Sequence, residues 1–333
     1  MISTPLGMIW YAACHRDRGC PQPIRKDFMN PRISLITVLL LFGGCTGCRA
    51  LSSSPEGGSP APSAPTARTP SPAFSPAPPT ATPKPTLLPP EPRDVTFNLE
   101  DGTQLSGTYY PGGLHPSPVV ILMHWYPGDQ EDWTEIAHWL QNRGLSGPGG
   151  NVPWRDPAWF PDIAPERSYA AVTFTFSGCR GGCQEPDRAS WAAQAAEVVA
   201  QAGKLPGVDP HRIAVIGASI GGDGAMIGCE ALLGDPDLTC RGVLSLSPGN
   251  YLGNHYLESA ARLSEADPPR PVWCFYDRND HTADLCQDLQ GDHVLTQVYG
   301  GGYLHGMHLI NPDLDPSPLG EALQFLEGTL EEN

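Results

Sequence analysis

The sequence predicts an α/β fold in which a mostly parallel central sheet carries helices on both faces. From Arg93 onward, short apolar runs alternate with segments of helical spacing, an order typical of a parallel sheet. Pro118–His124 is apolar almost throughout, as expected of a strand buried on both faces. Hydrophobic residues make up 40% of the chain, which is enough for a core and excludes a wholly disordered protein.

The expected elements follow one another through residues 93–333. A hairpin comes first, because polarity alternates on both sides of Glu100-Asp-Gly102. Glu131–Arg143 has helical spacing and is expected to stop at Gly144. The other predicted strands are Tyr169–Phe176, His211–Gly217, Arg241–Ser247, Pro271–Asp277 and His293–Tyr299, and the other predicted helices include Arg188–Gln201, Ile220–Leu233, Thr282–Leu289 and Pro318–Leu330. One sheet of this size makes a single domain of about 240 residues.

Charge and proline are distributed unevenly over the 333 residues. Residues 1–92 hold eight Lys or Arg and four Asp or Glu, whereas residues 93–333 hold twelve and thirty-two. The strongly acidic body argues against nucleic acid and anionic lipid as direct partners. Fourteen of the 38 prolines lie between Pro55 and Pro92. Residues 46–92, which are mostly Ser, Pro, Ala, Thr and Gly, are therefore predicted to form a disordered linker. A segment of this composition buries too little apolar surface to offset the entropy lost on ordering.

An export signal precedes this linker. Ile33–Phe42 is apolar but only about half as long as a membrane span, which fits a signal peptide over residues 29–45. We expect translation to start at Met29, so that residues 1–28 are a mis-assigned extension. Leu41-Phe-Gly-Gly-Cys45 resembles the lipobox of bacterial lipoproteins. The resemblance implies that Cys45 is lipidated and anchors the protein to a membrane, with an ordinary secretory signal as the alternative.

The clearest chemical motif is Gly217-Ala-Ser219-Ile-Gly221. This G-x-S-x-G pattern lies between the predicted strand Ile213–Ile216 and the predicted helix that begins at Ile220. A sharp strand–turn–helix exposes the central serine at the edge of the sheet, and the flanking glycines avoid collisions with the backbone. A serine at the start of a helix is also a common cap, but the flanking elements favour Ser219 as a nucleophile.

With this motif in place, residues 93–333 resemble the α/β-hydrolase superfamily, closest to its dienelactone-hydrolase-like and small-esterase branches. Dienelactone hydrolases carry cysteine where this chain has Ser219, so the resemblance implies an esterase-type enzyme. It also implies the order nucleophile, acid, histidine along the chain. The acid should follow the strand that ends near Tyr276, where Asp280 is the preferred candidate and Asp277 the competitor.

The histidine should lie after the last strand. His305 is followed by glycine ahead of the terminal helix and resembles the catalytic position of the family, with His308 as runner-up. The resemblance also implies an oxyanion hole made by two backbone N–H groups. Ile220 supplies one, as the residue after the nucleophile, and Tyr126 the other, in the loop His124-Trp-Tyr-Pro-Gly128.

Six cysteines fall in the predicted domain. An even number behind an export signal suggests disulfides, although six cysteines allow fifteen pairings. Local spacing favours Cys179 with Cys183, Cys229 with Cys240 and Cys274 with Cys286. Zinc is the alternative, but no CxxC pair supports it. Residues 146–167 form a long, aromatic connection that either borders the acyl pocket or packs its own rings.

The sequence thus predicts an exported serine hydrolase acting on a small-molecule carboxylic ester, without cofactor or metal. A second hypothesis is a non-catalytic binding lipoprotein with the same fold, since fold alone does not imply activity. A peptidase or an acyltransferase using the same three residues is a third.

Overall fold

The computed structural model describes residues 87–331, except 148 and 185. The predicted start at Met29, the signal peptide with Cys45 and most of the predicted linker lie outside these residues. Between residues 87 and 331, none of the helices has both the length and the apolarity needed to cross a bilayer.

Eight strands form one sheet in the order β1-β2-β4-β3-β5-β6-β7-β8. β1 and β2 form the predicted hairpin, and β2 runs antiparallel to β4, while all pairs from β4 to β8 are parallel. The mostly parallel sheet is therefore confirmed. The strands are β1 (Arg93–Asn98), β2 (Gln104–Tyr110), β3 (Ser117–Met123), β4 (Ala170–Phe174), β5 (Val208–Ala218), β6 (Cys240–Leu246), β7 (Val272–Asp277) and β8 (Val294–Tyr299).

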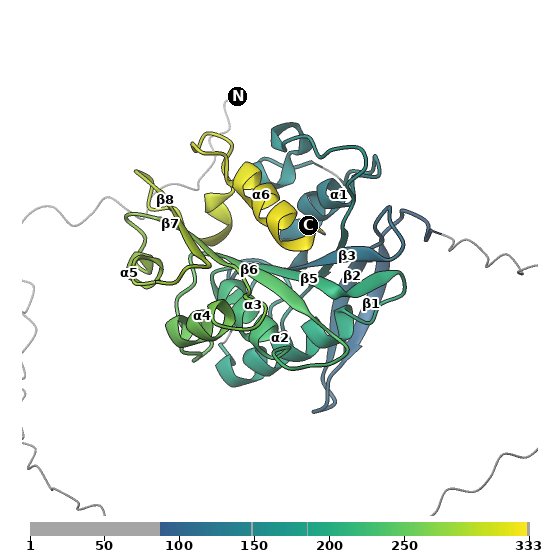
Figure 1. Ribbon diagram of the computed structural model, residues 1–333. Coiled ribbons are helices and arrows are strands. Elements are labelled where there is room, and N and C mark those ends of the chain that lie inside the picture. Colours follow the sequence, from purple (N-terminus) through teal and green to yellow (C-terminus); the bar gives the residue numbers. More distant parts are fainter. Residues whose placement is uncertain (1–86, 148, 185, 332–333) are drawn as a thin grey trace, which may run out of the picture. The chain divides into compact units, whose positions relative to one another are not determined.

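Helices cover both faces of this sheet (Figure 1), with α1 and α6 on one face and α2, α3 and α4 on the other. The α-helices are α1 (Thr134–Gln141), α2 (Arg188–Ala202), α3 (Ile220–Glu230), α4 (Tyr256–Ser264), α5 (Ala283–Gln287) and α6 (Pro318–Leu330). The short 3-10 helices are η1 (Gln130–Trp133), η2 (Pro153–Arg155), η3 (Pro157–Trp159) and η4 (Gly306–Leu309).

The sheet separates two hydrophobic layers. Trp191 of α2, Met226 of α3 and Tyr256 of α4 pack on one face, while Trp133 of η1 and Phe325 of α6 pack on the other. Every residue of β3 and β4 is buried. The continuous apolar runs in the sequence are therefore explained by burial on both faces.

Three helices end earlier than the sequence predicts: α5 stops at Gln287 and not at Leu289, and α1 and α3 are also shorter. α1 stops at Gln141 because Asn142 adopts a left-handed conformation and its N–H donates to the carbonyl of Trp139, an ending that asparagine tolerates. α3 stops at Glu230, and Leu232 and Leu233 continue with tighter i to i−3 bonds. Local hydrogen bonds at helix ends decide these boundaries.

Candidate functional site

Ser219 occupies the turn between β5 and α3, as the motif predicts. Its φ of 52° and ψ of −116° lie outside the regions that a side chain normally prefers. The flanking glycines are required, since a Cβ at Gly217 would overlap the carbonyl of Gly221, and a Cβ at Gly221 would overlap that of Met123. The turn thus presents Ser219 at the carboxyl end of β5, at the N-terminus of α3, where negative charge is favoured.

The histidine and the acid come from the two loops beyond. Asp280 follows β7 and His305 follows β8, and both strands run parallel to β5. His305 Nε2 lies 2.8 Å from Ser219 Oγ, and His305 Nδ1 lies 2.8 Å from Asp280 Oδ2. The structure therefore brings the three predicted residues into one hydrogen-bonded chain. The geometry is that of a serine, a base and an orienting acid.

The two competing candidates lie outside this chain. The carboxylate of Asp277 accepts the N–H groups of Asn279 and Gly302 at 2.7 and 3.2 Å. His308 lies against the rings of Trp125 and Trp154, at centroid distances of 4.8 and 5.6 Å. Burial, followed by the neighbouring His305, lowers the pKa of His308. Its surroundings are thus those of a neutral packing residue.

Asp280 is hidden from solvent, with a side chain that is 0% exposed. Burial by itself would raise its pKa, but hydrogen bonds from His305 and the N–H of Thr282 outweigh burial, so the pKa lies below its ordinary value. Asp280 is consequently ionised at neutral pH and favours a positive charge on the histidine beside it.

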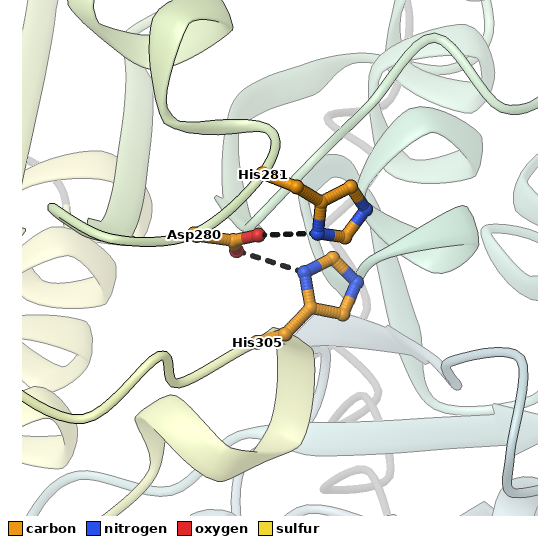
Figure 2. A group of neighbouring side chains, drawn as sticks. All are labelled: Asp280, His281 and His305. Carbon is orange, nitrogen blue, oxygen red and sulfur yellow. Dashed lines mark hydrogen bonds and ion pairs between the residues drawn. The ribbon is translucent and has the colours of Figure 1, made fainter. Parts of the chain in front are cut away.

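A second histidine contacts the same carboxylate (Figure 2). His281 Nδ1 lies 2.9 Å from Asp280 Oδ1, and its ring centroid lies 4.9 Å from that of His305. On the other side of the ring, His281 Nε2 lies 3.0 Å from the hydroxyl of Tyr251. A neutral His281 with its proton on Nδ1 satisfies both contacts, donating to Asp280 and accepting from Tyr251.

Among the residues that the structure describes, Asp280, His281 and His305 also form a group that could ligate a metal ion, because one donor atom of each lies within 4.8 Å of the others. However, Nδ1 of each histidine already faces an oxygen of Asp280 at hydrogen-bond distance. Hydrogen bonding accounts for this cluster without an ion.

Of the two predicted oxyanion donors, Ile220 directly follows Ser219, and the loop that carries Tyr126 begins beside the Ser219 turn. Gly221 packs on the carbonyls of Met123 and His124, which brings the end of β3 against the Ser219 turn. Within the described part of the chain, the N–H groups of Tyr126 and Ile220 donate to no protein acceptor. They are therefore free to receive a ligand oxygen.

Trp125 stands where the resembled family has glycine, and the site accommodates its ring. Trp125 Nε1 donates to Asp132 Oδ2 at 2.8 Å, and the ring is buried. Gly306 makes room for it, since a Cβ there would lie 3.0 Å from the Trp125 ring and 3.5 Å from the Ser219 Cβ. The glycine after His305 is thus explained by packing, because a side chain there would crowd the ring of Trp125.

The aromatic rings of the connection between residues 146 and 167 pack on segments outside it. Trp154 is buried with its ring centroid 5.9 Å from that of Trp125. Phe160 instead packs on Trp139 of α1, at 5.6 Å. One end of this segment therefore borders the loop beside Ser219, and the other is ordinary surface packing.

Three disulfides join the pairs that local spacing favours: Cys179–Cys183, Cys229–Cys240 and Cys274–Cys286. The last links β7 to α5, on either side of the loop that carries Asp280. This prediction of pairing is confirmed.

Sequence reasoning missed three features of the site. It did not predict the contact between His281 and Asp280, for which their adjacency in the sequence was the available signal. It did not single out Tyr251. It also gave no role to Asp223, whose buried carboxylate accepts the N–H groups of Gly249, Asn250 and Leu252 at 3.0–3.3 Å.

No protein-family model matches the sequence, and a comparison with curated protein sequences gave no significant match. Solved structures do match. An esterase from Pyrococcus furiosus has a TM-score of 0.51 at 16% identity, over 72% of this chain and 92% of that chain. An α/β hydrolase from Penicillium sp. sh18 has a TM-score of 0.49 at 14% identity, over 72% and 99%. A dienelactone hydrolase from Anabaena variabilis has 0.47 at 14%, over 72% and 96%. With its sheet order and its strand–Ser219–helix turn, the chain has the α/β-hydrolase fold.

Proposed function

We propose that this protein is an exported serine hydrolase that cleaves carboxylic esters, with Ser219 as nucleophile, His305 as general base and Asp280 as the acid that orients it. The observation that carries the proposal is the pair of 2.8 Å contacts that link these side chains. The positive φ of Ser219 supports it, since backbone strain of this kind concentrates at functional sites.

The reaction begins when His305 Nε2 takes the proton of Ser219 Oγ, as Oγ attacks the ester carbonyl carbon. The carbonyl oxygen becomes an oxyanion, and the imidazolium of His305 is stabilised by Asp280. His305 then gives its proton to the departing alcohol oxygen, which leaves an acyl group on Ser219. Water then gives a proton to the same nitrogen as its oxygen attacks the acyl carbon. The bond between Ser219 Oγ and the acyl carbon breaks, His305 returns the proton to Oγ, and the carboxylic acid leaves.

The oxyanion is held in this proposal by the N–H groups of Tyr126 and Ile220. Both are free of protein acceptors in the described region, and Ile220 is the first residue of α3, where the helix dipole adds to the attraction. Each such donor typically contributes about 3 kcal/mol to the stability of the transition state.

Export is part of the proposal. Three disulfides are rare in cytosolic proteins and common in exported ones, which agrees with the signal read from residues 29–45. Growth with labelled palmitate tests the anchor. The natural chain is expected to incorporate label and Cys45→Ala to lose it, and label that is retained by Cys45→Ala contradicts lipidation at Cys45.

A fluorophosphonate probe tests the chemistry, because it reacts covalently with activated serines. We expect labelling of the purified protein and none of Ser219→Ala. A folded protein that takes no label contradicts catalysis and favours a binding lipoprotein, and label on Ser219→Ala means another nucleophile. A panel of acyl esters against matched amides then separates an esterase from a peptidase, and product analysis with an added alcohol detects acyl transfer.

A further inference from the structure

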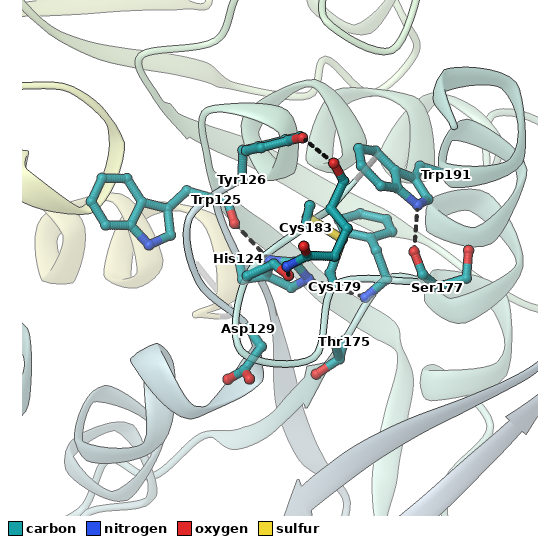
Figure 3. Close-up of a disulfide and its surroundings, with 12 residues drawn as sticks. His124, Trp125, Tyr126, Asp129, Thr175, Ser177, Cys179, Cys183 and Trp191 are labelled. Atoms are coloured by element: carbon teal, nitrogen blue, oxygen red, sulfur yellow. Dashed lines mark hydrogen bonds between the residues drawn. A yellow bond between two sulfur atoms is a disulfide. The ribbon is translucent and has the colours of Figure 1, made fainter. Parts of the chain in front are cut away.

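A disulfide-closed turn lies against the loop that carries the proposed oxyanion donor Tyr126 (Figure 3). This turn, Cys179–Cys183, follows β4, and the oxyanion loop, His124–Asp129, follows β3. The Cys183 N–H donates to the Tyr126 carbonyl at 2.9 Å. From the same turn, the Gly181 N–H donates to Asp129 Oδ2 at 2.7 Å.

Hydrogen bonds hold both peptide planes next to Tyr126, one from within the oxyanion loop and one from the turn. The carbonyl of Trp125 lies 2.8 Å from His124 Nδ1 and accepts the N–H of Gly128 at 3.2 Å. Because a trans peptide is planar, fixing the carbonyl of Trp125 fixes the direction of the Tyr126 N–H, which points the opposite way. The Cys183 N–H fixes the following peptide plane through the Tyr126 carbonyl. Hydrogen bonds therefore hold the peptide planes before and after Tyr126.

The residues just before the turn hold the histidine that contacts the carbonyl of Trp125. The N–H of Phe176 donates to His124 Nε2 at 3.0 Å, which leaves the proton of the ring on Nδ1, facing the carbonyl of Trp125. Burial lowers the pKa of His124 and keeps the ring neutral. Phe176 in turn accepts the N–H of Cys179 at 3.1 Å, so one segment supports both peptide planes.

Contact between the turn and the loop is backbone to backbone. Gly182 has a φ of +105°, and a Cβ there would lie 2.8 Å from the carbonyl oxygen of Pro127. Gly181 also has a positive φ, of +70°, but a Cβ there would meet nothing within 4 Å. The two adjacent glycines therefore share a left-handed backbone and differ in whether a side chain would push on the oxyanion loop.

We infer that the Cys179–Cys183 turn is a positioning element for catalysis, which aims the Tyr126 N–H at the developing oxyanion. The inference rests on the proposed function. The hydrogen bonds that the structure describes for the turn reach the oxyanion loop and Phe176, and none reaches Ser219, Asp280 or His305. The effect of the turn should therefore appear where charge develops, in kcat, and not in KM.

The matched pair Gly182→Ala and Gly181→Ala tests it. Ester hydrolysis by Gly182→Ala is expected to show a kcat at least about 10-fold below that of Gly181→Ala, at similar KM, because losing an oxyanion donor outright costs about 10²–10³ in kcat. Affinity for a trifluoromethyl ketone that forms a tetrahedral adduct should fall in parallel. Equal kcat values in the two variants, or a loss confined to KM, overturn the inference.

Removal of the disulfide gives a second test that does not depend on Gly182→Ala folding. Cys179→Ser with Cys183→Ser is compared with Cys229→Ser with Cys240→Ser, which opens a disulfide between the end of α3 and the start of β6. Only the first pair is expected to lower kcat and to speed hydrogen exchange in residues 124–129. Unchanged exchange in these residues, or the same loss of kcat in both pairs, contradicts a positioning role.

Assays of the natural protein distinguish a failure of the positioning inference from a failure of the proposed function. If it neither hydrolyses esters nor reacts with a fluorophosphonate, the proposed function fails and the inference falls with it. If it does both and Ser219→Ala does neither, the proposed function stands, and the glycine and cysteine variants decide the inference alone.

Discussion

Two buried carboxylates lie near the Ser219 turn, and their pKa values shift in opposite directions. Asp223 lies in the first turn of α3 and Asp280 in the loop after β7, and both are hidden from solvent. Burial is the largest influence on each. It raises the pKa of Asp223 to about 6 despite bonds from backbone N–H groups. For Asp280, hydrogen bonds led by that of His305 outweigh burial, and the pKa falls.

The difference separates a structural acid from a chemical one. Asp223 ties the segment Gly249–Leu252, which includes Tyr251, to the helix that begins after Ser219. The groups that donate to Asp223 are backbone N–H groups, which are neutral and do not ionise. Asp280 faces a side chain that becomes charged during the proposed reaction. A carboxylate that must be ionised therefore has a partner that gains charge, whereas one that only fastens a loop tolerates a raised pKa.

The largest expected effect is on catalysis. Asp280→Asn should lower kcat by about 10³–10⁴, because the amide no longer stabilises charged His305 or holds its tautomer. Steady-state ester hydrolysis measures the loss, and circular dichroism verifies folding. The matched control is Asp277→Asn, at the competing acid, which is expected to change kcat by less than about 10-fold because one oxygen still accepts a backbone N–H. A larger loss in Asp277→Asn than in Asp280→Asn reverses the assignment.

Next comes the disulfide that braces the loop of Asp280. Cys274 and Cys286 are twelve residues apart, and opening a loop of this length typically costs about 3 kcal/mol in the free energy of unfolding. We expect that loss for Cys274→Ser with Cys286→Ser, measured by urea unfolding, and a change in kcat of less than about 10-fold well below the melting temperature. A loss of kcat comparable to that of Asp280→Asn means that the loop does not hold its shape without the link.

The raised pKa of Asp223 predicts a pH dependence of stability. Its folded pKa, about 6, exceeds the unfolded value of about 3.9, so the folded state binds more protons between these values. Asp223 thus lowers the free energy of unfolding as pH rises from about 4 to 6. The stability advantage of the natural protein over Asp223→Asn should shrink by about 2 kcal/mol from pH 4 to 7.

Urea unfolding of both proteins at half-unit pH steps measures this change. Asp280 should give a pH dependence of stability with the opposite sign, because its folded pKa lies below the unfolded value. Its contribution is present above about pH 4 and is lost as the pH falls below that value. An advantage over Asp223→Asn that grows between pH 4 and 7 means that the pKa of Asp223 is lowered, and the contrast between the two acids disappears.

The sequence was sufficient for the sheet and for the positions of Ser219, Asp280 and His305, because each follows a recognisable apolar strand and parallel strands end at one edge. It was not sufficient for the bonds between Asp223 and residues 249–252. Leu252 and Asp223 are 29 positions apart, and no local periodicity encodes a bond between a side chain and a distant loop. The same holds for Cys183 and Tyr126, whose contact depends on how two loops pack after both strands are in place.

The smallest expected effect is at His281, the second histidine on Asp280. Its side chain is 69% exposed, and Asp280 keeps its bonds to His305 and the Thr282 N–H without it. We expect His281→Ala to lower kcat/KM by about 2- to 10-fold, since a contact between an exposed side chain and a carboxylate contributes little free energy. His281→Asn, whose amide can donate near the position of Nδ1, should recover part of the loss in the same ester assay. A loss in His281→Ala as large as that in Asp280→Asn shows that His281 handles the proton, and His305 is then not the sole base that the proposed mechanism requires.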